Sequence, residues 1–367
     1  MTFYKYDYLL VGSGLFSSVF AQQAKEHGKK CLIIEKRSHI GGNCYTERHD
    51  EIDVHKYGPH IFHTNDKRIW DYINRWTEFN NFRYHPKVNY ENKLFSFPIN
   101  MMTFYQLWGT KTPKEVEDKL NKVKINFENP NNLEEWILSQ VGEELYKTFI
   151  YGYTKKQWGK EPNQLPASII KRLPLRFVYD ENYFNDFYQG IPIGGYTKIF
   201  EKMLKDVPVE LNIDYFSDRE YFDKLAKKIV YTGAIDQFFN YEFGNLEWRS
   251  LEFSEEKFEN LDFQGVAAIN YTSESIPYTR IIEHKHFDNR GQKNTIITKE
   301  YPKKWEIGSE KYYPINDEYN NELLIKYRNM VDCEKYIFGG RLADYRYYDM
   351  HQVIGSSLKK VHLELNR

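Results

Sequence analysis

The sequence predicts a multi-domain α/β protein that begins with a Rossmann-like βαβ unit. Three observations predict this fold. An apolar run at residues 8–11 leads into a glycine turn, a segment with apolar residues at helical spacing extends to Gly28, and a second apolar run at 31–34 ends at Glu35. Strand, tight turn, helix and strand in this order form the unit that binds a dinucleotide at a helix N-terminus.

The glycine turn carries the dinucleotide fingerprint in a modified form. Gly12 and Gly14 stand at its first two positions, and Ser17 replaces the third glycine. The glycines let backbone N–H groups approach a pyrophosphate, and Glu35, 23 residues after Gly12, stands where the adenosine ribose hydroxyls would lie. A lone motif of this kind could be an ordinary turn, but this one follows a strand and opens a helix. We therefore predict a dinucleotide-binding site.

Composition limits the possible partners. A chain of 367 residues is longer than one core usually serves, so two or three domains are expected. The formal net charge of −1 argues against nucleic acid or an anionic membrane as the main partner. No run of about 18 apolar residues occurs, and Cys31, Cys44 and Cys333 form no C-x-x-C pair. We expect a soluble cytoplasmic protein with a small-molecule partner, no membrane span and no nucleic acid.

The middle of the chain predicts two further domains. Helical signals begin at Thr112, where an N-cap, a first-turn proline and the capping-box residue Glu115 follow one another, and they continue through 133–141. Runs rich in β-branched and aromatic residues at 267–272 and 294–298 predict an antiparallel sheet.

Two later segments return the chain to the first domain. Residues 228–233 read as a strand that runs into a glycine turn, and residues 336–340 read as another strand followed by a helical tail. The expected boundaries are 1–75, 190–236 and 315–367 for a discontinuous cofactor domain, 98–189 for an inserted helical domain, and 76–97 with 237–314 for the antiparallel sheet domain.

Further glycine pairs favour FAD over NAD as the dinucleotide. Gly42 and Asn43 lie just beyond the second strand, where flavin enzymes of the glutathione-reductase-like class often carry a second glycine pair by the cofactor. A C-terminal strand ends in Gly340 and Arg341, and an arginine there can face the flavin pyrophosphate. Each pair alone is more often a turn than a ligand contact, but together they favour FAD.

Longer motifs give most of the chain a family resemblance. In chain order they are Gly41-Gly-Asn43, His55-Lys-Tyr-Gly58, His60-Ile-Phe-His63-Thr, Gly152-Tyr-Thr-Lys-Lys-Gln-Trp158-Gly159, Ile170-Lys-Arg172, Tyr183-Phe184, Pro277-Tyr-Thr-Arg280-Ile-Ile-Glu-His-Lys-His-Phe287 and Tyr345-Arg-Tyr347-Tyr-Asp349-Met. In these motifs the chain resembles the bacterial UDP-galactopyranose mutases.

The resemblance implies an isomerase that interconverts UDP-galactopyranose and UDP-galactofuranose with no net redox change. In the family, N5 of reduced FAD attacks the anomeric carbon and expels UDP, so the flavin serves as a nucleophile. The resemblance further implies NADPH or NADH as the reductant, a homodimer, and a role in cell-surface polysaccharide biosynthesis. The N-acetyl sugar remains a possible second substrate.

The resemblance also implies roles for individual residues. Departing UDP gains negative charge, which preorganised arginines stabilise with paired hydrogen bonds, while uracil needs a flat apolar partner and phosphates accept hydrogen bonds from uncharged hydroxyls. The implied catalytic residues are Arg172, Arg280, His60 and His63. The implied substrate-binding residues are Tyr153, Trp158, Arg172, Tyr183, Arg249, Arg280, Tyr313, Tyr347 and Asp349. The cofactor-binding residues that we expect are Gly12, Ser13, Gly14, Leu15, Phe16, Glu35, Lys36, Gly42, Asn43, His60, Gly340, Arg341, Tyr347, Asp349 and Met350.

Each of these residues has a plainer interpretation. The arginines could form surface salt bridges, and the aromatic residues could be core packing. His60 and His63, with His55 nearby, could bind a metal ion, but no cysteine or carboxylate near them completes a site, and none is predicted. Two departures from the family concern the sugar pocket: Tyr84 replaces an asparagine, and Pro59 replaces a usually smaller residue. The substituent at the sugar 2-position therefore stays open.

Two rival functions remain at this point. The same cofactor fold serves flavin oxidoreductases of the amine-oxidase or desaturase type, because fold alone does not determine function. A flavin or nucleotide-sugar binding protein without catalysis is the second rival. Neither rival needs a pair of arginines placed to stabilise a departing diphosphate.

Overall fold

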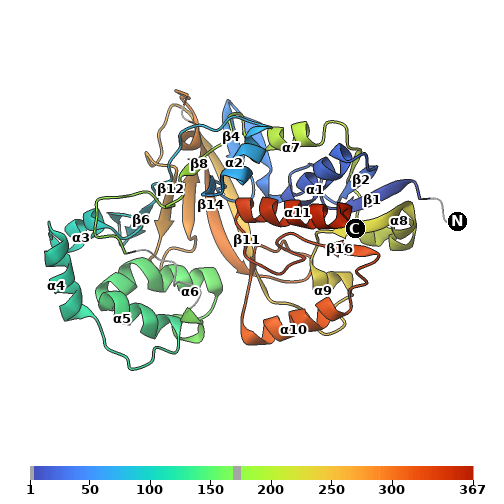
Figure 1. Cartoon of the computed structure of the whole chain (residues 1–367). Coiled ribbons are helices and arrows are strands. Elements are labelled where there is room, and N and C mark those ends of the chain that lie inside the picture. The colour runs from blue at the N-terminus through green and yellow to red at the C-terminus, as the bar shows by residue number, and fades with distance from the viewer. Residues whose placement is uncertain (1–3, 168–174, 289, 367) are drawn as a thin grey trace.

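The structure has a parallel sheet at one end, a helical region at the opposite end and a larger mixed sheet between them (Figure 1). It is a computed structural model, and it describes residues 4–167, 175–288 and 290–366. Within these ranges no helix is both long enough and apolar enough to cross a membrane. The mixed α/β fold class predicted from the sequence is confirmed.

Five parallel strands form the first sheet. In spatial order they are β16 (Tyr336–Phe338), β10 (Ala226–Tyr231), β1 (Tyr6–Val11), β2 (Cys31–Glu35) and β9 (Val209–Leu211). Val11 stands beside Ile34 on one side and Tyr231 on the other, so the carboxyl ends of these strands align at one edge. That edge is where α/β sheets bind their ligands. The Rossmann-like unit is built from distant parts of the chain, as predicted.

Helices cover both faces of this sheet. One face packs against α1 (Leu15–Glu26), α7 (Thr197–Met203) and α11 (Met350–Leu365), and the other face packs against α8 (Arg219–Leu225) and α9 (Ile235–Phe238). Leu9 and Leu10 are adjacent in β1 and both fully buried, because successive side chains of a strand point to opposite faces. Burial on both faces explains the unbroken apolar runs in the sequence.

The second sheet has seven strands. Their order is β15 (Tyr313–Pro314), β11 (Trp248–Phe258), β14 (Thr295–Lys304), β13 (Arg280–Glu283), β12 (Ala268–Tyr271), β6 (Lys87–Tyr90) and β7 (Lys93–Ser96). All pairs are antiparallel except β12 with β6. The expectation of a purely antiparallel sheet is therefore wrong at this pair. β6 reaches the sheet from a remote segment, and no hairpin forces an antiparallel direction on it.

The helical region follows β7. It consists of α3 (Met101–Trp108), α4 (Pro113–Val123), α5 (Leu133–Leu145), a π-helical turn η2 (Tyr146–Tyr151), α6 (Gly152–Trp158) and a short 3₁₀ turn η3 (Pro162–Gln164). Thr112 caps α4 as predicted, since its side chain accepts from the Glu115 N–H at 3.3 Å. The Glu115 carboxylate instead accepts from the N–H of Lys111, one residue before the N-cap. Thr112 and Glu115 thus both form capping hydrogen bonds, but the Glu115 carboxylate binds the N–H of Lys111 and not that of Thr112.

Short elements connect the sheets. Two small ribbons are formed by β3 (Thr46–His49) with β4 (Ile52–His55), and by β5 (Phe62–Thr64) with β8 (Tyr188–Gly190). The other connecting elements are η1 (Gly42–Cys44), α2 (Lys67–Asn74), η5 (Tyr215–Ser217), η6 (His284–Phe287) and α10 (Glu318–Asn329). The β5–β8 ribbon matters for function because it brings the residues around His63 beside the segment that follows the helical region.

Replacing Gly12 with alanine should destabilise the protein more than replacing Gly28. Both glycines have positive φ, +96° and +72°, so each alanine is strained by about 1–3 kcal/mol. Only at Gly12 would the new Cβ meet another group, the Thr232 Oγ1 at 2.5 Å, which donates to the Val11 carbonyl; nothing lies within 4 Å at Gly28. Thermal unfolding of both flavin-free variants measures the difference, and equal losses would contradict the close approach.

Candidate cofactor and substrate site

Backbone segments approach closely at the carboxyl edge of the parallel sheet. No side chain in the described part of the chain caps α1 at Gly14, which leaves the first N–H groups of the helix for an anion. A Cβ on Gly42 would lie 3.0 Å from the Gly14 Cα. The two glycine turns predicted as cofactor contacts are therefore packed against each other.

The Glu35 carboxylate is held beside this turn by three donors. The backbone N–H and the hydroxyl of Ser13 each donate to Oε2 at 2.8 Å, and the Arg37 N–H donates to Oε1 at 2.9 Å. The side chain is only 5% exposed. The acid at the end of the second strand and the glycine turn thus form one unit, which is the arrangement that ribose binding requires.

The segment after Glu35 connects the cofactor site to the seven-stranded sheet. Arg37 donates to the Asn43 Oδ1 at 3.0 Å and to the Glu310 carboxylate at 2.6 Å. Lys36 lies 3.7 Å from the same carboxylate and is otherwise exposed. Of the two predicted cofactor contacts in this segment, Asn43 is therefore oriented by Arg37, while Lys36 lies at the surface.

The C-terminal strand meets α1 at the same edge. A Cβ on Gly339 would lie 2.1 Å from the Phe16 ring, and Gly340 has φ +91°. The Phe16 ring is 2% exposed and belongs to the core, so only its backbone can face a cofactor. Arg341 donates to the Tyr348 carbonyl at 2.6 Å and lies 5.1 Å from the centre of the Tyr347 ring. The predicted contacts Leu15 and Met350 line an apolar recess beside this edge.

Three neutral histidines lie beside the cofactor edge. The His60 N–H donates to the His55 Nδ1 at 3.1 Å, and the His55 N–H donates to the His284 Nδ1 at 3.3 Å. Burial lowers the pKa of His284 to about 3, and burial with the nearby Arg341 charge lowers that of His60 to about 4. Burial likewise holds the pKa of His55 well below its ordinary value. Because the His55 Nδ1 is an acceptor, its Nε2 carries the proton, and this buried donor has no hydrogen-bond partner among the described residues.

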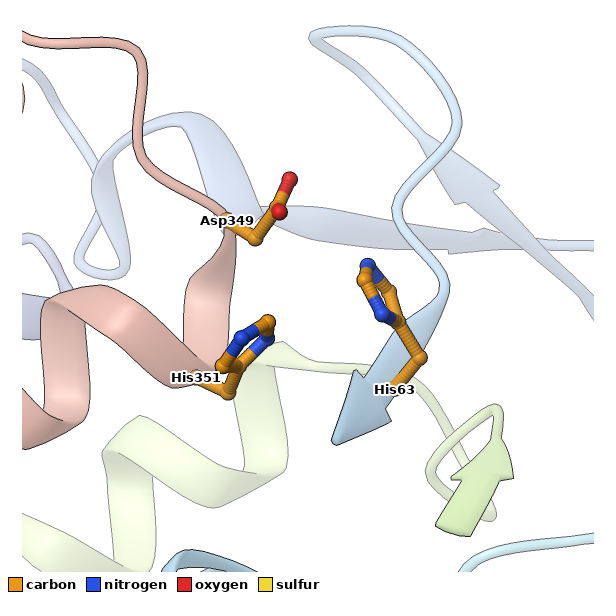
Figure 2. Close-up of side chains that lie close together, drawn as sticks. All are labelled: His63, Asp349 and His351. Carbon is orange, nitrogen blue, oxygen red and sulfur yellow. The ribbon is translucent and has the colours of Figure 1, made fainter. Parts of the chain in front are cut away.

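His63 lies in a different cluster, shown in Figure 2. Its Nδ1 is 2.5 Å from the Asp186 carboxylate. The ring also lies beside Asp349 and His351, and one nitrogen or oxygen atom from each of these three side chains lies within 4.8 Å of the other two. The sequence argument against a metal ion, that no carboxylate lies near these histidines, does not hold in the fold. Asp186 occupies Nδ1, however, and Asp349 caps α11, so we interpret the cluster as a hydrogen-bonded polar group.

Arg280 lies at the start of β13 with its guanidinium held from two sides. Nε donates to the Asn270 Oδ1 at 3.1 Å, and Nη2 donates to the Tyr153 hydroxyl at 3.1 Å. Glu300 is its partner across the sheet and is 1% exposed, with one carboxylate oxygen unpaired among the described residues. Although burial acts to lower it, the pKa of Arg280 is held well above its ordinary value by Glu300. The site therefore keeps a cation that a diphosphate can approach.

Tyrosines line the same region. Tyr313 and Tyr347 stack with ring centres 5.7 Å apart, and Tyr183 lies edge-on to Tyr84 at 5.4 Å. Tyr84, one of the two departures from the family, is 6% exposed, and burial raises its pKa although the Arg280 charge opposes the shift. The departure thus lies near Arg280 and Tyr183, two of the residues predicted to bind substrate.

Helix α6 is anchored so that Tyr153 and Trp158 keep their places. The Lys156 ammonium donates to four backbone carbonyls at 2.8–3.1 Å, those of Tyr271, Ser273, Ile276 and Tyr278. Arg249 donates to the carbonyls of Gln157 and Lys156 at 2.8 and 3.1 Å, at the end of the same helix. The guanidinium of Arg249, predicted to bind substrate, is thus engaged with α6.

Of the remaining predicted site residues, Arg172 lies outside the described residues. Asp349 caps α11 through the Gln352 N–H, next to the predicted contact Tyr347. The sequence analysis missed Glu300, Asp186 and His351. Glu300 carried a usable signal, a carboxylate in a strand otherwise expected to be buried. His351 directly follows a matched motif, and Asp186 lies two residues after one.

The fold and the site define a class. A Rossmann-type unit with free helix N–H groups, a held acid and close backbone approach is a dinucleotide-binding domain. Beside it, a half-buried arginine surrounded by tyrosines forms a second site suited to a phosphorylated ligand. The protein is therefore a cofactor-dependent enzyme candidate with a separate site for an anionic substrate.

Comparisons with known proteins identify the family. The family model described as UDP-galactopyranose mutase matches residues 148–347, and that of an NAD(P)-binding Rossmann-like domain matches residues 10–76. A dTDP-fucopyranose mutase of Escherichia coli is 39% identical over 362 residues, covering 96% of each chain. A probable UDP-galactopyranose mutase of Klebsiella pneumoniae is 40% identical over 360 residues, covering 96% of this chain and 92% of its own. The chain belongs to the UDP-galactopyranose mutase family.

Solved structures agree on the fold. The crystal structure of a reduced UDP-galactopyranose mutase matches with a TM-score of 0.77 at 13% identity, covering 99% of this chain and 94% of its own. A putrescine oxidase matches with a TM-score of 0.61 at 11% identity, covering 99% of both chains. Both likenesses concern the fold alone. Family membership therefore makes the enzyme an isomerase and disfavours the oxidoreductase alternative.

Stability should fall below neutral pH because buried histidines must take up protons on unfolding. The folded pKa of His284 is lowered from 6.5 to about 3, so its contribution is complete above pH 6.5 and is lost as the pH falls toward 3. Between pH 7 and pH 5, wild type should lose roughly 2 kcal/mol more unfolding free energy than His284→Gln. Urea unfolding measures this, and His362→Gln, at an exposed histidine, should behave as wild type.

Proposed function

We propose that this protein binds FAD and, when the flavin is reduced, interconverts UDP-galactopyranose and UDP-galactofuranose without net redox change. One observation carries the proposal: Arg280 is held as a half-buried cation by Asn270 and Tyr153, beside an edge built for a dinucleotide. An oxidoreductase on this fold needs a substrate pocket but no such cation for a leaving diphosphate.

The residues present fit FAD. The free N–H groups at Gly14, the close contact of Gly42 with Gly14, and the held carboxylate of Glu35 match the needs of its ADP half. The unpartnered buried Nε2 donor of His55 and the unpartnered Nδ1 of His351 supply polar atoms that a bound group can satisfy. When bound in its reduced form, the flavin supplies the nucleophile of the reaction.

The chain's own residues then bind, orient and stabilise charge. Arg280 offers a fixed fork to the diphosphate and stabilises the negative charge that grows on UDP as it departs. Tyr313 and Tyr347 present hydroxyls without adding charge, and Trp158 at the end of α6 offers a flat face for uracil. Glu300 keeps Arg280 charged while the neighbouring histidines stay neutral, which places the positive charge at the diphosphate.

The nucleotide sugar itself has a second candidate. Identity is 39% to the dTDP-fucopyranose mutase and 40% to the probable UDP-galactopyranose mutase, so overall likeness does not separate the two substrates. Fucose lacks the 6-hydroxyl of galactose, and thymidine differs from uridine at the base and the ribose. Tyr84 packs edge-on against Tyr183 and is larger than the asparagine expected from the family resemblance, which favours a sugar without an added bulky substituent.

A direct product analysis tests the function. The reduced enzyme is offered UDP-galactopyranose, its N-acetyl counterpart and dTDP-fucopyranose in separate reactions, and furanose formation is followed by chromatography. We expect the UDP-galactose reaction to be fastest, with reductant needed only in catalytic amount. Consumption of one NADPH per sugar converted would show an oxidoreductase instead. NADPH or NADH as reductant, and a homodimer, are part of the proposal.

Replacing Arg280 with lysine should lower turnover by at least about 10²-fold, the usual scale for losing one charge-stabilising group. Lysine keeps a charge opposite Glu300, which protects folding, but it loses the fork that contacts Asn270 and Tyr153. Steady-state kinetics measures turnover, and flavin absorbance checks that the cofactor is retained. Arg68→Ala, at an exposed arginine paired with Asp66, serves as the matched control.

Unchanged turnover in Arg280→Lys would show that the fork is not needed and would remove the observation on which the function rests. Loss of flavin in that variant would instead assign Arg280 to the cofactor.

A further inference from the structure

Asp186 and His63 form a close pair whose geometry is unlike that of a surface contact. The Asp186 Oδ2 lies 2.5 Å from the His63 Nδ1, and the His63 side chain is 9% exposed. The other carboxylate oxygen accepts from the Asn65 Nδ2 at 2.6 Å. Each oxygen of Asp186 therefore has one partner, and the carboxylate cannot turn away from the imidazole without losing both.

The ring plane of His63 is also held. The ring stacks on Phe184 with centres 3.7 Å apart and planes 13° apart, so its rotation is restricted. The Phe187 N–H donates to the Asn65 Oδ1 at 2.8 Å, and the Gln189 Nε2 donates to the Asp186 carbonyl at 2.6 Å. These bonds fasten the segment that carries Asp186 to β5, and they fix the direction in which the carboxylate points.

A carboxylate at Nδ1 determines which nitrogen of a histidine carries the proton. The carboxylate only accepts, so Nδ1 must be the protonated atom, and in the neutral ring Nε2 is then a proton acceptor. This is how an aspartate holds the imidazole in hydrolase triads, where it orients the ring and stabilises its charged form. Nε2 of His63 is then the nitrogen left without the Asp186 contact, on a ring that lies beside Asp349 and His351 in Figure 2.

The groups that face His63 come from three elements. Asp186 and Asn65 lie at the β5–β8 ribbon, and Asp349 and His351 lie at the start of α11, where the His351 ring is edge-on to His63 at 5.1 Å. Burial lowers the pKa of His351, and its buried Nδ1 has no partner among the described residues. His63 therefore lies beside two carboxylates and a second imidazole ring.

The proposed reaction requires a proton to move. In the pyranose the ring is closed through O5 and the 4-hydroxyl is protonated; in the furanose the ring is closed through O4 and the 5-hydroxyl is protonated. One proton therefore leaves O4 and one arrives at O5, with no net change in charge or oxidation state. A group that takes a proton and returns it serves both steps.

We propose that Asp186 is a positioning residue that holds His63 in the Nδ1-protonated tautomer, so that the His63 Nε2 carries this proton between the two sugar oxygens. The proton transfer by His63 rests on the proposed function. The positioning of the His63 ring by Asp186 concerns the protein alone. A purely structural role of Asp186, as an anchor of the segment through Asn65, is the competing interpretation.

The tautomer is measured by nuclear magnetic resonance on the flavin-loaded protein with ¹⁵N-labelled histidine, and His63→Gln identifies the His63 signals by their loss. We expect the wild-type His63 to show the proton on Nδ1, and Asp186→Asn to lose that preference because its amide can donate to Nδ1. Asn65→Ala, which loosens the anchor but leaves the carboxylate at His63, should keep the wild-type tautomer. An unchanged tautomer in Asp186→Asn overturns the proposal.

Steady-state kinetics tests whether the His63 Nε2 carries the proton. Asp186→Asn should lower kcat by about 10–10² with KM little changed, because the ring is no longer held in the tautomer whose Nε2 accepts a proton. Asp186→Glu should recover part of kcat. Asp206→Asn, at an exposed aspartate paired with Lys25, is the matched control and should behave as wild type.

Failure of the proposed function can be distinguished from failure of the proposal for Asp186 and His63. If wild type converts none of the three sugars yet shows the Nδ1 tautomer, the proposed function fails while the positioning by Asp186 stands. If wild type turns over and Asp186→Asn changes the tautomer without changing kcat, His63 does not carry the proton and the proposal is overturned. A shift in KM that Asn65→Ala reproduces supports the structural anchor instead.

Discussion

The whole architecture depends on backbone packing without side chains at the carboxyl edge of the parallel sheet. Gly12, Gly42 and Gly339 each lie where a Cβ would meet another group within about 3 Å, respectively Thr232, Gly14 and Phe16. Because the chain can approach itself there, α1 begins with free N–H groups, and β16 can leave the sheet directly above it. The loop from Arg341 to Asp349 directly follows β16 and Gly340. Close packing at these glycines therefore positions both the cofactor edge and part of the candidate substrate site.

The candidate site contains a charged pair, Arg280 and Glu300, and a group of neutral histidines, His55, His60 and His284. On the sheet side, Arg280 stays charged because Glu300 faces it across β13 and β14. On the cofactor side, burial keeps His55, His60 and His284 neutral, and backbone hydrogen bonds determine which nitrogens are free. A diphosphate is therefore attracted to Arg280, while the three histidines add no charge beside a flavin.

Family membership determines the class of reaction more firmly than it determines the sugar. Relatives named for two different nucleotide sugars match this chain almost equally over nearly its whole length. The residues proposed to hold the leaving diphosphate would serve any such sugar. Selection among sugars must come from side chains that face the sugar ring, and Tyr84, buried against Tyr183 and Phe184, is one place where this chain differs from the asparagine expected from the family resemblance. Small changes in one pocket wall can alter the substrate without altering the fold.

Local signals in the sequence determined the βαβ unit, the capped helix at Thr112 and the return of the C-terminal strand, because strand and helix periodicity and glycine turns are properties of neighbouring residues. Motifs also located Arg280, Tyr153 and His63. The tertiary structure alone decided that β6 joins β12 in parallel, that Glu300 faces Arg280, that Arg249 holds α6, and that Asp186 meets His63 from a segment more than a hundred residues away. Such pairs depend on how sheets and ribbons bring remote segments together, and no local pattern of residues encodes that meeting.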